Sequence, residues 1–202
     1  MSVFDLPARL GRPLLASGSP RRVELLREAG FDPVVAPQDV DETPLPDETP
    51  TSLVERLARL KATSALGEAA PGQLVVAADT TVWLGESDLG KPADDEDARR
   101  MLRLLSGRTH HVSTGVCLAI AGPAPDDARI ASFVETTGVT FYELDEATID
   151  AYVATGEPSD KAGAYGIQGL GRALVRGIDG DYYNVVGLPV ARLLREVERM
   201  IR

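Results

Sequence analysis

The chain has 202 residues, of which 44% are hydrophobic and 26% are charged, a composition typical of an ordinary globular protein. Its formal net charge of −10 argues against a non-specific nucleic-acid binder, because such proteins need a broad basic surface to neutralise phosphates. A single cysteine, Cys117, excludes an internal disulfide and a cysteine-rich zinc site, and no apolar run approaches the ~20 residues of a membrane span. The N-terminal residues lack the features of a signal peptide, so we expect a cytoplasmic protein without a membrane partner.

The first half of the chain carries five segments with a clear secondary-structure signal. In chain order they are a buried strand ending at 14–16, a helix at 23–29, a loop at 39–52, a helix at 53–66, and a strand at 74–84 that leads into the turn GESD. Ser19 can cap the first helix, Pro20 suits its first position and Gly30 stops it. The second helix presents three leucines on one face: Leu53, Leu57 and Leu60.

The second half continues the alternation of helices and strands. In chain order we expect a helix at 94–105, strands at 111–121 and 130–142 joined by the turn GPAPDD, a helix at 145–154, a Gly-rich stretch at 163–171, a strand pair around 173–187 and a last helix after Pro189. The apolar side chains of the first and last of these helices are Ala98, Met101, Leu102 and Leu105, and Leu193, Leu194, Val197 and Ile201. The order predicts an α/β fold with a mixed sheet flanked by helices, in one domain over residues 1–202 that has two lobes and a cleft.

The stretch SGSPRR, residues 17–22, places two arginines in the first turn of the predicted helix. Positive charge is disfavoured there by roughly 0.3–1 kcal/mol, because the helix dipole already makes that end positive. The turn from Ser17 to Ser19 exposes backbone N–H groups that suit phosphate or carboxylate, and Arg21 and Arg22 would add charge for a ligand with several negative groups. The alternative is a capped helix with two solvated arginines.

Asp79 follows the apolar run LVVAA, and an acid at that place in a strand usually needs a metal, a cation or a reacting water. Thr80 comes next as a hydroxyl contact. Three further charged residues are candidates for the same chemistry: Glu42, Lys61 and Lys91. Each also has a plain alternative, because a strand-end aspartate can cap a turn, a loop glutamate is normally solvated and a lysine normally reaches solvent.

The stretch DKAGAYGIQGLG, residues 160–171, is neither a Walker loop nor a dinucleotide fingerprint. Its glycines permit close approach to a ligand, and Lys161 and Gln168 are the polar side chains that could contact that ligand. The alternative is a generic Gly-rich loop. His110 and His111 are adjacent and would face opposite sides of a strand, which is poor geometry for holding a metal. Cys117 lies in the apolar run VCLAIA and is expected in the core.

Six blocks, taken together and in order, resemble the Maf family of nucleotide pyrophosphatases. They are SGSPRRVELL, AADTTV, LGKP, SGRTHHVSTGV, DKAGAYGIQG and GDYYNVVGLP, and they run from about Leu14 to Leu194. The resemblance implies an enzyme that hydrolyses nucleoside triphosphates to the monophosphate and pyrophosphate with a divalent cation, Mg²⁺ or Mn²⁺. It also implies a mixed, elongated sheet of the inosine-triphosphatase type with a deep cleft, and it suggests a homodimer.

The resemblance also implies roles for single residues. Asp79 matches the family's proton acceptor, and Glu42 is the second carboxylate suited to the cation. The residues that match positions tied to substrate choice are Arg21, Thr80 and Gln168. Those that match the polar cleft for phosphates and metal are Arg22, Glu42, Lys61 and Lys91.

The form DKAGAYGIQG, with Lys161 and Gln168, looks like the branch of the family that prefers dTTP and UTP. The chemistry agrees, because a Gln amide offers one donor and one acceptor, and uracil and thymine present a carbonyl beside an N–H. Two alternatives stay open. One is the same chemistry on 7-methyl-GTP or another modified nucleotide, and the other is a nucleotide-binding regulator of cell division with little turnover.

Overall fold

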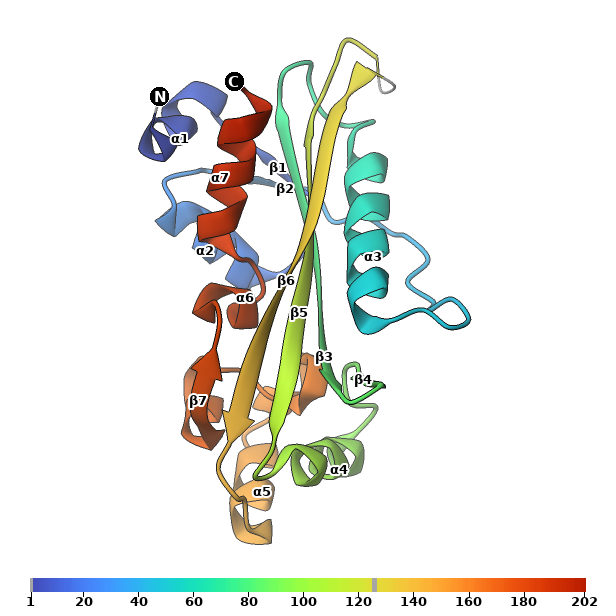
Figure 1. Ribbon diagram of the computed structural model, residues 1–202, viewed down its shortest axis with the longest axis vertical. Helices are drawn as coiled ribbons and strands as arrows, with labels where there is room; N and C mark the ends of the chain where they lie inside the picture. The colour runs from blue at the N-terminus through green and yellow to red at the C-terminus, as the bar shows by residue number, and fades with distance from the viewer. Residues whose placement is uncertain (1, 125–126) are drawn as a thin grey trace. The chain divides into compact units, whose positions relative to one another are not determined.

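The structure of the protein is a computed structural model that describes residues 2–124 and 127–202 (Figure 1). Its α-helices are α1 (Leu6–Leu10), α2 (Pro20–Glu28), α3 (Pro50–Ala65), α4 (Asp95–Leu105), α5 (Glu146–Val153), α6 (Tyr182–Val186) and α7 (Val190–Met200). Its strands are β1 (Leu14–Leu15), β2 (Val34–Val35), β3 (Leu74–Leu84), β4 (Ser87–Leu89), β5 (Thr109–Ile120), β6 (Arg129–Phe141) and β7 (Val175–Asp179). The described residues also include the short 3₁₀ segments η1 (Val3–Asp5), η3 (Glu157–Asp160), η4 (Ala162–Ala164) and η5 (Gly169–Leu174).

Within the described ranges the strands form one sheet in the order β2-β1-β3-β5-β6-β7, with β4 paired to β3. Strand β1 pairs in parallel with both β2 and β3, whereas β4 is antiparallel to β3 and β7 is antiparallel to β6. A sheet that combines both kinds of pairing and is flanked by helices confirms the predicted mixed α/β class. None of the helices in the described ranges combines the length and the apolar character that a membrane crossing requires.

The chain divides into two compact units. Unit 1 comprises Met1–Asp79, Thr114–Glu135 and Gly187–Arg202, and unit 2 comprises Thr80–Ser113 and Thr136–Val186. The division falls inside β3, β5 and β6, so each of these long strands contributes residues to both units. The single domain over residues 1–202, and the cleft between lobes, stay predictions.

In unit 1, helix α3 packs against the strands through small side chains. Its alanines share one buried cluster with residues of β3 and β5: Ala58, Ala62, Ala65, Val75, Ala77, Cys117 and Ala119. The approach is closest at Gly115 of β5, where a Cβ atom would lie 2.2 Å from the carbonyl oxygen of Val54 in α3. Figure 1 shows α3 on one side of the strands and α2 and α7 on the other. The expectation that Cys117 is a core residue is confirmed.

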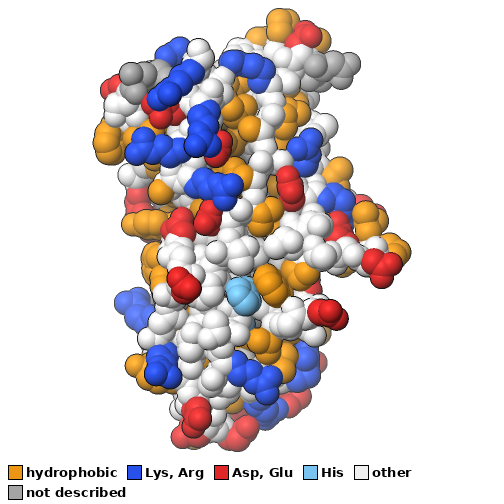
Figure 2. Space-filling view, viewed as in Figure 1, with side chains coloured by type: hydrophobic (Ala, Val, Ile, Leu, Met, Phe, Trp, Pro, Cys, Tyr) orange, Lys and Arg blue, Asp and Glu red, His pale blue; other side chains and the backbone are white. Residues whose placement is uncertain are grey.

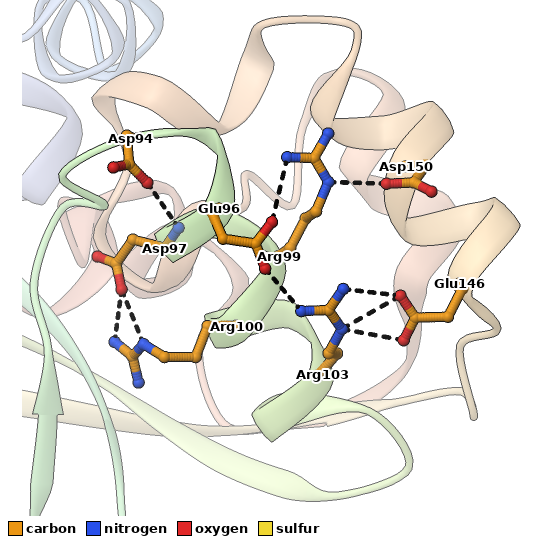
Figure 3. A network of polar contacts seen from close by, with 8 residues as sticks. All are labelled: Asp94, Glu96, Asp97, Arg99, Arg100, Arg103, Glu146 and Asp150. Carbon is orange, nitrogen blue, oxygen red and sulfur yellow. Dashed lines mark hydrogen bonds and ion pairs between the residues drawn. The ribbon is translucent and has the colours of Figure 1, made fainter.

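In unit 2, helices α4 and α5 share a second buried cluster. It contains the four α4 residues that the sequence predicts to face inward, Ala98, Met101, Leu102 and Leu105, together with Ile149, Tyr152 and Val153 of α5. On the outside, an ion-pair network joins the same two helices (Figure 3). The Arg103 guanidinium binds Glu146 at 2.8 Å and Glu96 at 3.1 Å, and the Arg99 Nε lies 2.7 Å from Asp150. The network gives a second, electrostatic link between helices that already share apolar packing.

Helix α3 begins earlier than predicted. Residues 50–52 belong to the helix and not to the loop, because the Thr49 hydroxyl accepts a hydrogen bond from the Ser52 N–H and Pro50 occupies the first helical position. The predicted apolar face is also partly wrong, since Leu60 is exposed. The buried face runs through Val54, Ala58 and Lys61 and turns the charged residue inward.

The end of the chain corrects a second prediction. Only the first strand of the pair expected around 173–187 exists, as β7, and the second is replaced by helix α6. The Asp181 carboxylate accepts a hydrogen bond from the Tyr183 N–H, and the fully buried Asn184 donates to the Val112 carbonyl at 2.9 Å. These bonds favour a helical turn over an extended chain.

Smaller differences concern turns and short elements. The turn within GESD consists of Gly85 and Glu86 alone, because Ser87–Leu89 forms β4. The segments η1, α1 and β2 were not predicted. Part of the expected turn GPAPDD, residues 125 and 126, lies outside the described residues.

Candidate active site

Three charged side chains of unit 1 meet at one ammonium group. The Lys61 Nζ lies 2.7 Å from the Asp79 Oδ1 and 2.6 Å from the Glu42 Oε1. The Lys61 and Asp79 side chains are only 11% and 18% exposed, whereas Glu42 is 59% exposed. The alternative of a lysine that reaches solvent is therefore wrong for Lys61, which is buried and held by two carboxylates.

The local sequence explains how Asp79, Lys61 and Glu42 are positioned. The five buried residues Leu74–Ala78 carry β3 into the core, and Asp79 is the next residue, where the strand becomes partly accessible. Lys61 lies on the buried face of α3, so its side chain points toward the strands and not outward. Glu42 comes from the acidic loop that precedes α3.

The acidic loop is anchored on α3 by an arginine, Arg56. The Arg56 guanidinium lies 2.7 Å from the Glu48 Oε1 and also donates to the Thr43 carbonyl at 3.1 Å. The Arg56 side chain raises the acidity of its partner, so the pKa of the Glu48 carboxyl is lowered. Because Thr43 adjoins Glu42, this pair fixes the loop beside the residue that contacts Lys61.

The Asp79 and Glu42 carboxylates fit a divalent cation in their chemistry. Their oxygens are hard donors that already converge on one cationic centre, the Lys61 ammonium. Mg²⁺ and Mn²⁺ commonly take one or two protein carboxylates and complete their coordination with water and substrate phosphate. Among the described residues no group of three or more His, Cys, Asp or Glu side chains forms a full protein cage.

Arg22 is bound mainly by the protein's own oxygens. Its guanidinium donates to the Ser17 hydroxyl at 2.9 Å, to the Ala78 carbonyl at 2.8 Å and to the Gly187 carbonyl at 2.9 Å. Burial lowers the pKa of Arg22, and the nearby Asp79 carboxylate opposes that shift. Arg22 thus ties the start of α2 to the residue before Asp79, a positioning contact that the sequence did not indicate.

The turn before α2 differs in detail from the prediction. Ser19 occupies the N-cap position, but its side chain makes no capping hydrogen bond because the hydroxyl does not reach the N–H groups of the first turn. Its own N–H donates to the Ser17 hydroxyl at 3.3 Å. Arg21 follows Pro20 in the first turn and, being cationic, lowers the pKa of Arg22 beside it. Two cations therefore do stand at the positive end of the helix, as the sequence indicates.

The other predicted site residues belong to unit 2. Thr80 is half-buried in β3, and Lys91 is exposed with no hydrogen bond or ion pair to the residues that the structure describes. The Lys161 Nζ donates to the Glu157 carbonyl and to the Asp160 carboxylate, both at 2.6 Å. Gln168 is half-buried, and its side-chain amide has no hydrogen-bond partner within residues 2–124 and 127–202.

The histidines are accounted for by packing. His110 is fully buried, with its Nε2 2.8 Å from the Tyr165 hydroxyl and its ring edge-on to Phe141 and Tyr165. Desolvation lowers the pKa of His110 to about 4. His111 stacks on Trp83 with the ring centroids 4.4 Å apart. The two adjacent rings therefore have different neighbours.

Charges of both signs are exposed on the face shown in Figure 2. On the face shown in Figure 2, basic side chains lie among acidic, hydrophobic and uncharged ones. This face therefore differs from the broad basic surface that binding to a long polyanion requires.

A model of the Maf-like protein family matches residues 12–200. The chain belongs to the Maf family. Two relatives, from Bacillus cytotoxicus and Bacillus cereus, are each named dTTP/UTP pyrophosphatase. Each is 49% identical over 186 residues, which cover 92% of this chain and 94% of the relative.

Two solved structures align with this Maf protein along most of its length. The Staphylococcus aureus Ham1 protein aligns with a TM-score of 0.47 and 18% identity, over 93% of this chain and 98% of that chain. The nucleoside-triphosphatase / dITP/XTP pyrophosphatase of Mycobacterium abscessus aligns with a TM-score of 0.42 and 15% identity, over 95% of this chain and 96% of that chain. At these TM-scores the likeness adds nothing to the family assignment.

Three residues near the predicted site of this Maf protein escaped sequence reasoning: Glu48, Arg56 and Glu157. An acidic loop that precedes a helix bearing an arginine is a weak signal for the first two. Glu157 gave no signal, because its partners Leu170 and Gly171 are backbone N–H groups 13 and 14 residues away.

Proposed function

We propose that this Maf protein is a nucleoside triphosphate pyrophosphatase that hydrolyses dTTP and UTP to the monophosphate and pyrophosphate. The observation that carries the proposal is the convergence of the Asp79 and Glu42 carboxylates on Lys61. It occurs in a chain that is 49% identical to relatives named dTTP/UTP pyrophosphatase. Nothing favours a second function with comparable weight.

In the proposed reaction a water molecule attacks the α-phosphorus. Asp79 holds this water and takes its proton, while the bond from the α-phosphorus to the bridging oxygen breaks and pyrophosphate leaves with the electron pair. The geometry supports this role because Asp79 stands at the partly accessible end of a buried strand segment, with Lys61 fixing its carboxylate.

A divalent cation, when bound by Asp79 and Glu42, would polarise a phosphate oxygen and lower the pKa of water. The chain's own cations stabilise the negative charge that develops on the leaving group, and we assign this task to Lys61 and Lys91. Ser17, Ser19, Arg21 and Arg22 form the phosphate-binding turn. The bonds from Arg22 to Ser17 and to the carbonyl before Asp79 hold that turn in register with the carboxylate.

Base recognition is assigned to Gln168, and Lys161 and Thr80 are assigned as further substrate-binding residues. The Gln168 amide is not engaged by the described part of the protein, so its donor and acceptor are available to a carbonyl and an adjacent N–H of uracil or thymine. The two bases differ by one methyl group, and a residue that reads this edge would accept both.

The proposal extends to organisation. We propose that residues 1–202 act as a single Maf domain, and that the protein forms a homodimer. Sedimentation equilibrium at several protein concentrations would give the mass in solution, and a strictly monomeric mass would refute the dimer without touching the catalytic proposal.

The deciding experiment measures pyrophosphate release from dTTP, UTP, CTP, dATP, GTP and 7-methyl-GTP with Mg²⁺, with Mn²⁺ and with EDTA. We expect release from dTTP and UTP that depends on the cation. A preference for 7-methyl-GTP would keep the chemistry and overturn the choice of base. Binding without release from any nucleotide would replace the enzyme by a nucleotide-binding regulator.

A further inference from the structure

The Gly-rich stretch that carries Gln168 is organised around one carboxylate, that of Glu157. The Leu170 N–H lies 2.9 Å from Oε1 and 3.1 Å from Oε2, and the Gly171 N–H lies 3.3 Å from Oε2. These N–H groups belong to the first turn of η5, for which Gln168 is the N-cap residue. The Glu157 side chain therefore caps the turn that begins directly after Gln168.

Glu157 also binds Lys161, the other polar residue singled out in the same stretch. Its backbone carbonyl accepts a hydrogen bond from the Lys161 Nζ at 2.6 Å. The Lys161 stem in turn covers Gly166, where a Cβ atom would lie 2.8 Å from the Lys161 Cε. One residue thus contacts Lys161 through its main chain and the backbone after Gln168 through its side chain.

The glycines on both sides of Gln168 have no room for a side chain. Gly169 has a φ of +65°, and a Cβ atom there would lie 2.6 Å from the Glu157 Oε1. A Cβ atom at Gly171 would lie 2.3 Å from the Gly166 carbonyl oxygen, and the Gly166 N–H donates to the Tyr152 hydroxyl at 3.2 Å. The stretch is closely packed main chain, and the half-buried Gln168 side chain has no hydrogen-bond partner among the described residues.

The charge on Glu157 is maintained by this arrangement. The Leu170 N–H, followed by that of Gly171, lowers the pKa of the Glu157 carboxyl, while partial burial opposes the shift. The carboxylate is therefore ionised at neutral pH, in the form that accepts both N–H groups.

We propose that Glu157 is a positioning residue for base selection, which acts by holding the turn that aims the Gln168 amide. The inference rests on the proposed function only in taking Gln168 as the residue that reads the base. A residue of purely structural importance would lower stability without changing which base is preferred.

The test is a double-mutant cycle on nucleotide binding. Dissociation constants for dTTP and dCTP are measured by calorimetry in EDTA for the wild type, Glu157→Ala, Glu157→Gln, Gln168→Ala and the double variant Glu157→Ala/Gln168→Ala. Glu143→Ala, which removes an exposed carboxylate of the same unit, is the matched control. The exchange rates of the Leu170 and Gly171 amides are followed by NMR.

We expect Glu157→Ala to reduce the preference for dTTP over dCTP about tenfold, with faster amide exchange at the two N–H groups, and to have no further effect once Gln168 is alanine. Glu157→Gln keeps the chain length and one acceptor, so it should lie between the wild type and the alanine variant. With Mg²⁺ present, kcat for dTTP should change less than threefold while KM rises. Glu143→Ala should match the wild type.

If either Glu157 variant folds and keeps the wild-type preference for dTTP over dCTP, the inference is overturned. It is also overturned if Glu157→Ala reduces this preference equally in the wild-type and the Gln168→Ala backgrounds. A wild type that binds dTTP and dCTP equally would overturn it as well. If pyrophosphate is never released but the cycle behaves as expected, the inference stands and the proposed hydrolysis fails.

Discussion

Replacing Arg56 by alanine tests whether the acidic loop is held on α3 by a strong interaction. The guanidinium makes two contacts with Glu48, with Nε 2.7 Å from Oε1 and Nη2 2.7 Å from Oε2. The Glu48 side chain is 6% exposed and that of Arg56 is 23% exposed, so the pair is shielded from water. Without Arg56, the Glu48 carboxylate keeps one hydrogen bond within the described residues, from the Leu45 N–H to Oε2 at 3.0 Å.

The expected loss follows from that geometry. Charge-assisted hydrogen bonds contribute about 1.5–3 kcal/mol each, whereas exposed ion pairs contribute about 0.2–1 kcal/mol. Since the pair is bidentate and mostly buried, the free energy of unfolding should fall by about 2–3 kcal/mol. For a chain of this size that corresponds to a drop of roughly 5–10 °C in Tm.

The assay is urea unfolding followed by circular dichroism at pH 7, together with a thermal scan. Arg12→Ala is the matched control, because the Arg12 Nε lies 2.9 Å from the Asp32 Oδ2, a distance close to that of the Arg56–Glu48 pair, but the two side chains are 63% and 65% exposed. That control should lose less than about 1 kcal/mol. A loss for Arg56→Ala no larger than that of the control would refute the argument that burial makes this pair strong.

The same pair predicts a dependence on pH. Arg56 lowers the pKa of Glu48, so the stabilisation is present above the usual Glu range and is lost as pH falls through the lowered pKa. The difference in stability between the wild type and Arg56→Ala should therefore narrow in acid. A difference that stays constant from pH 7 to pH 3.5 would show that the contribution comes from packing and not from the charge.

Three further predictions concern single residues. Asp79→Asn should lower kcat for dTTP by at least about 100-fold with the dissociation constant little changed, and near wild-type turnover in a pyrophosphate assay would remove Asp79 from the base role. Gln168→Ala should reduce the ratio of kcat/KM for UTP over CTP more than it slows UTP itself, and an intact ratio would show that another group reads the base. Burial lowers the pKa of His110 to about 4, so the folded state loses stability as pH falls below 6.5, by about 2–3 kcal/mol at pH 4.5. The His110→Phe variant should lack this loss in unfolding experiments, and a pH profile identical to that of the wild type would assign the loss to other groups.

The features around the candidate site that the sequence predicts correctly are those with a local signature. An acid that ends an apolar strand run stands out, and Asp79 does lie at the end of five buried residues. A serine-rich turn before a helix with Pro at its first position also has a local signature, and α2 begins there as Pro20 indicates. Strand β3 has the predicted bounds, and helix α4 buries the four apolar residues that its spacing predicts.

The parts that sequence reasoning missed depend on partners far along the chain. Whether Lys61 reaches solvent or turns inward is decided by Asp79, 18 residues later, and by the close packing of α3 on β5. The choice between strand and helix at 182–186 is decided by the bond from Asn184 to Val112, which lies 72 residues before it. Periodicity carries no information on such contacts, because they depend on which elements become neighbours.

Gly115 gives the location of Lys61 an unexpected origin. The backbone of α3 at Val54 rests directly on this glycine, with no space for even a methyl group. Such a contact fixes both the position of the helix along its axis and its rotation about that axis. Lys61 lies seven residues, about 10 Å, farther along the same helix. The position and direction from which the Lys61 ammonium approaches its two carboxylates are thus set by a distant residue that has no side chain.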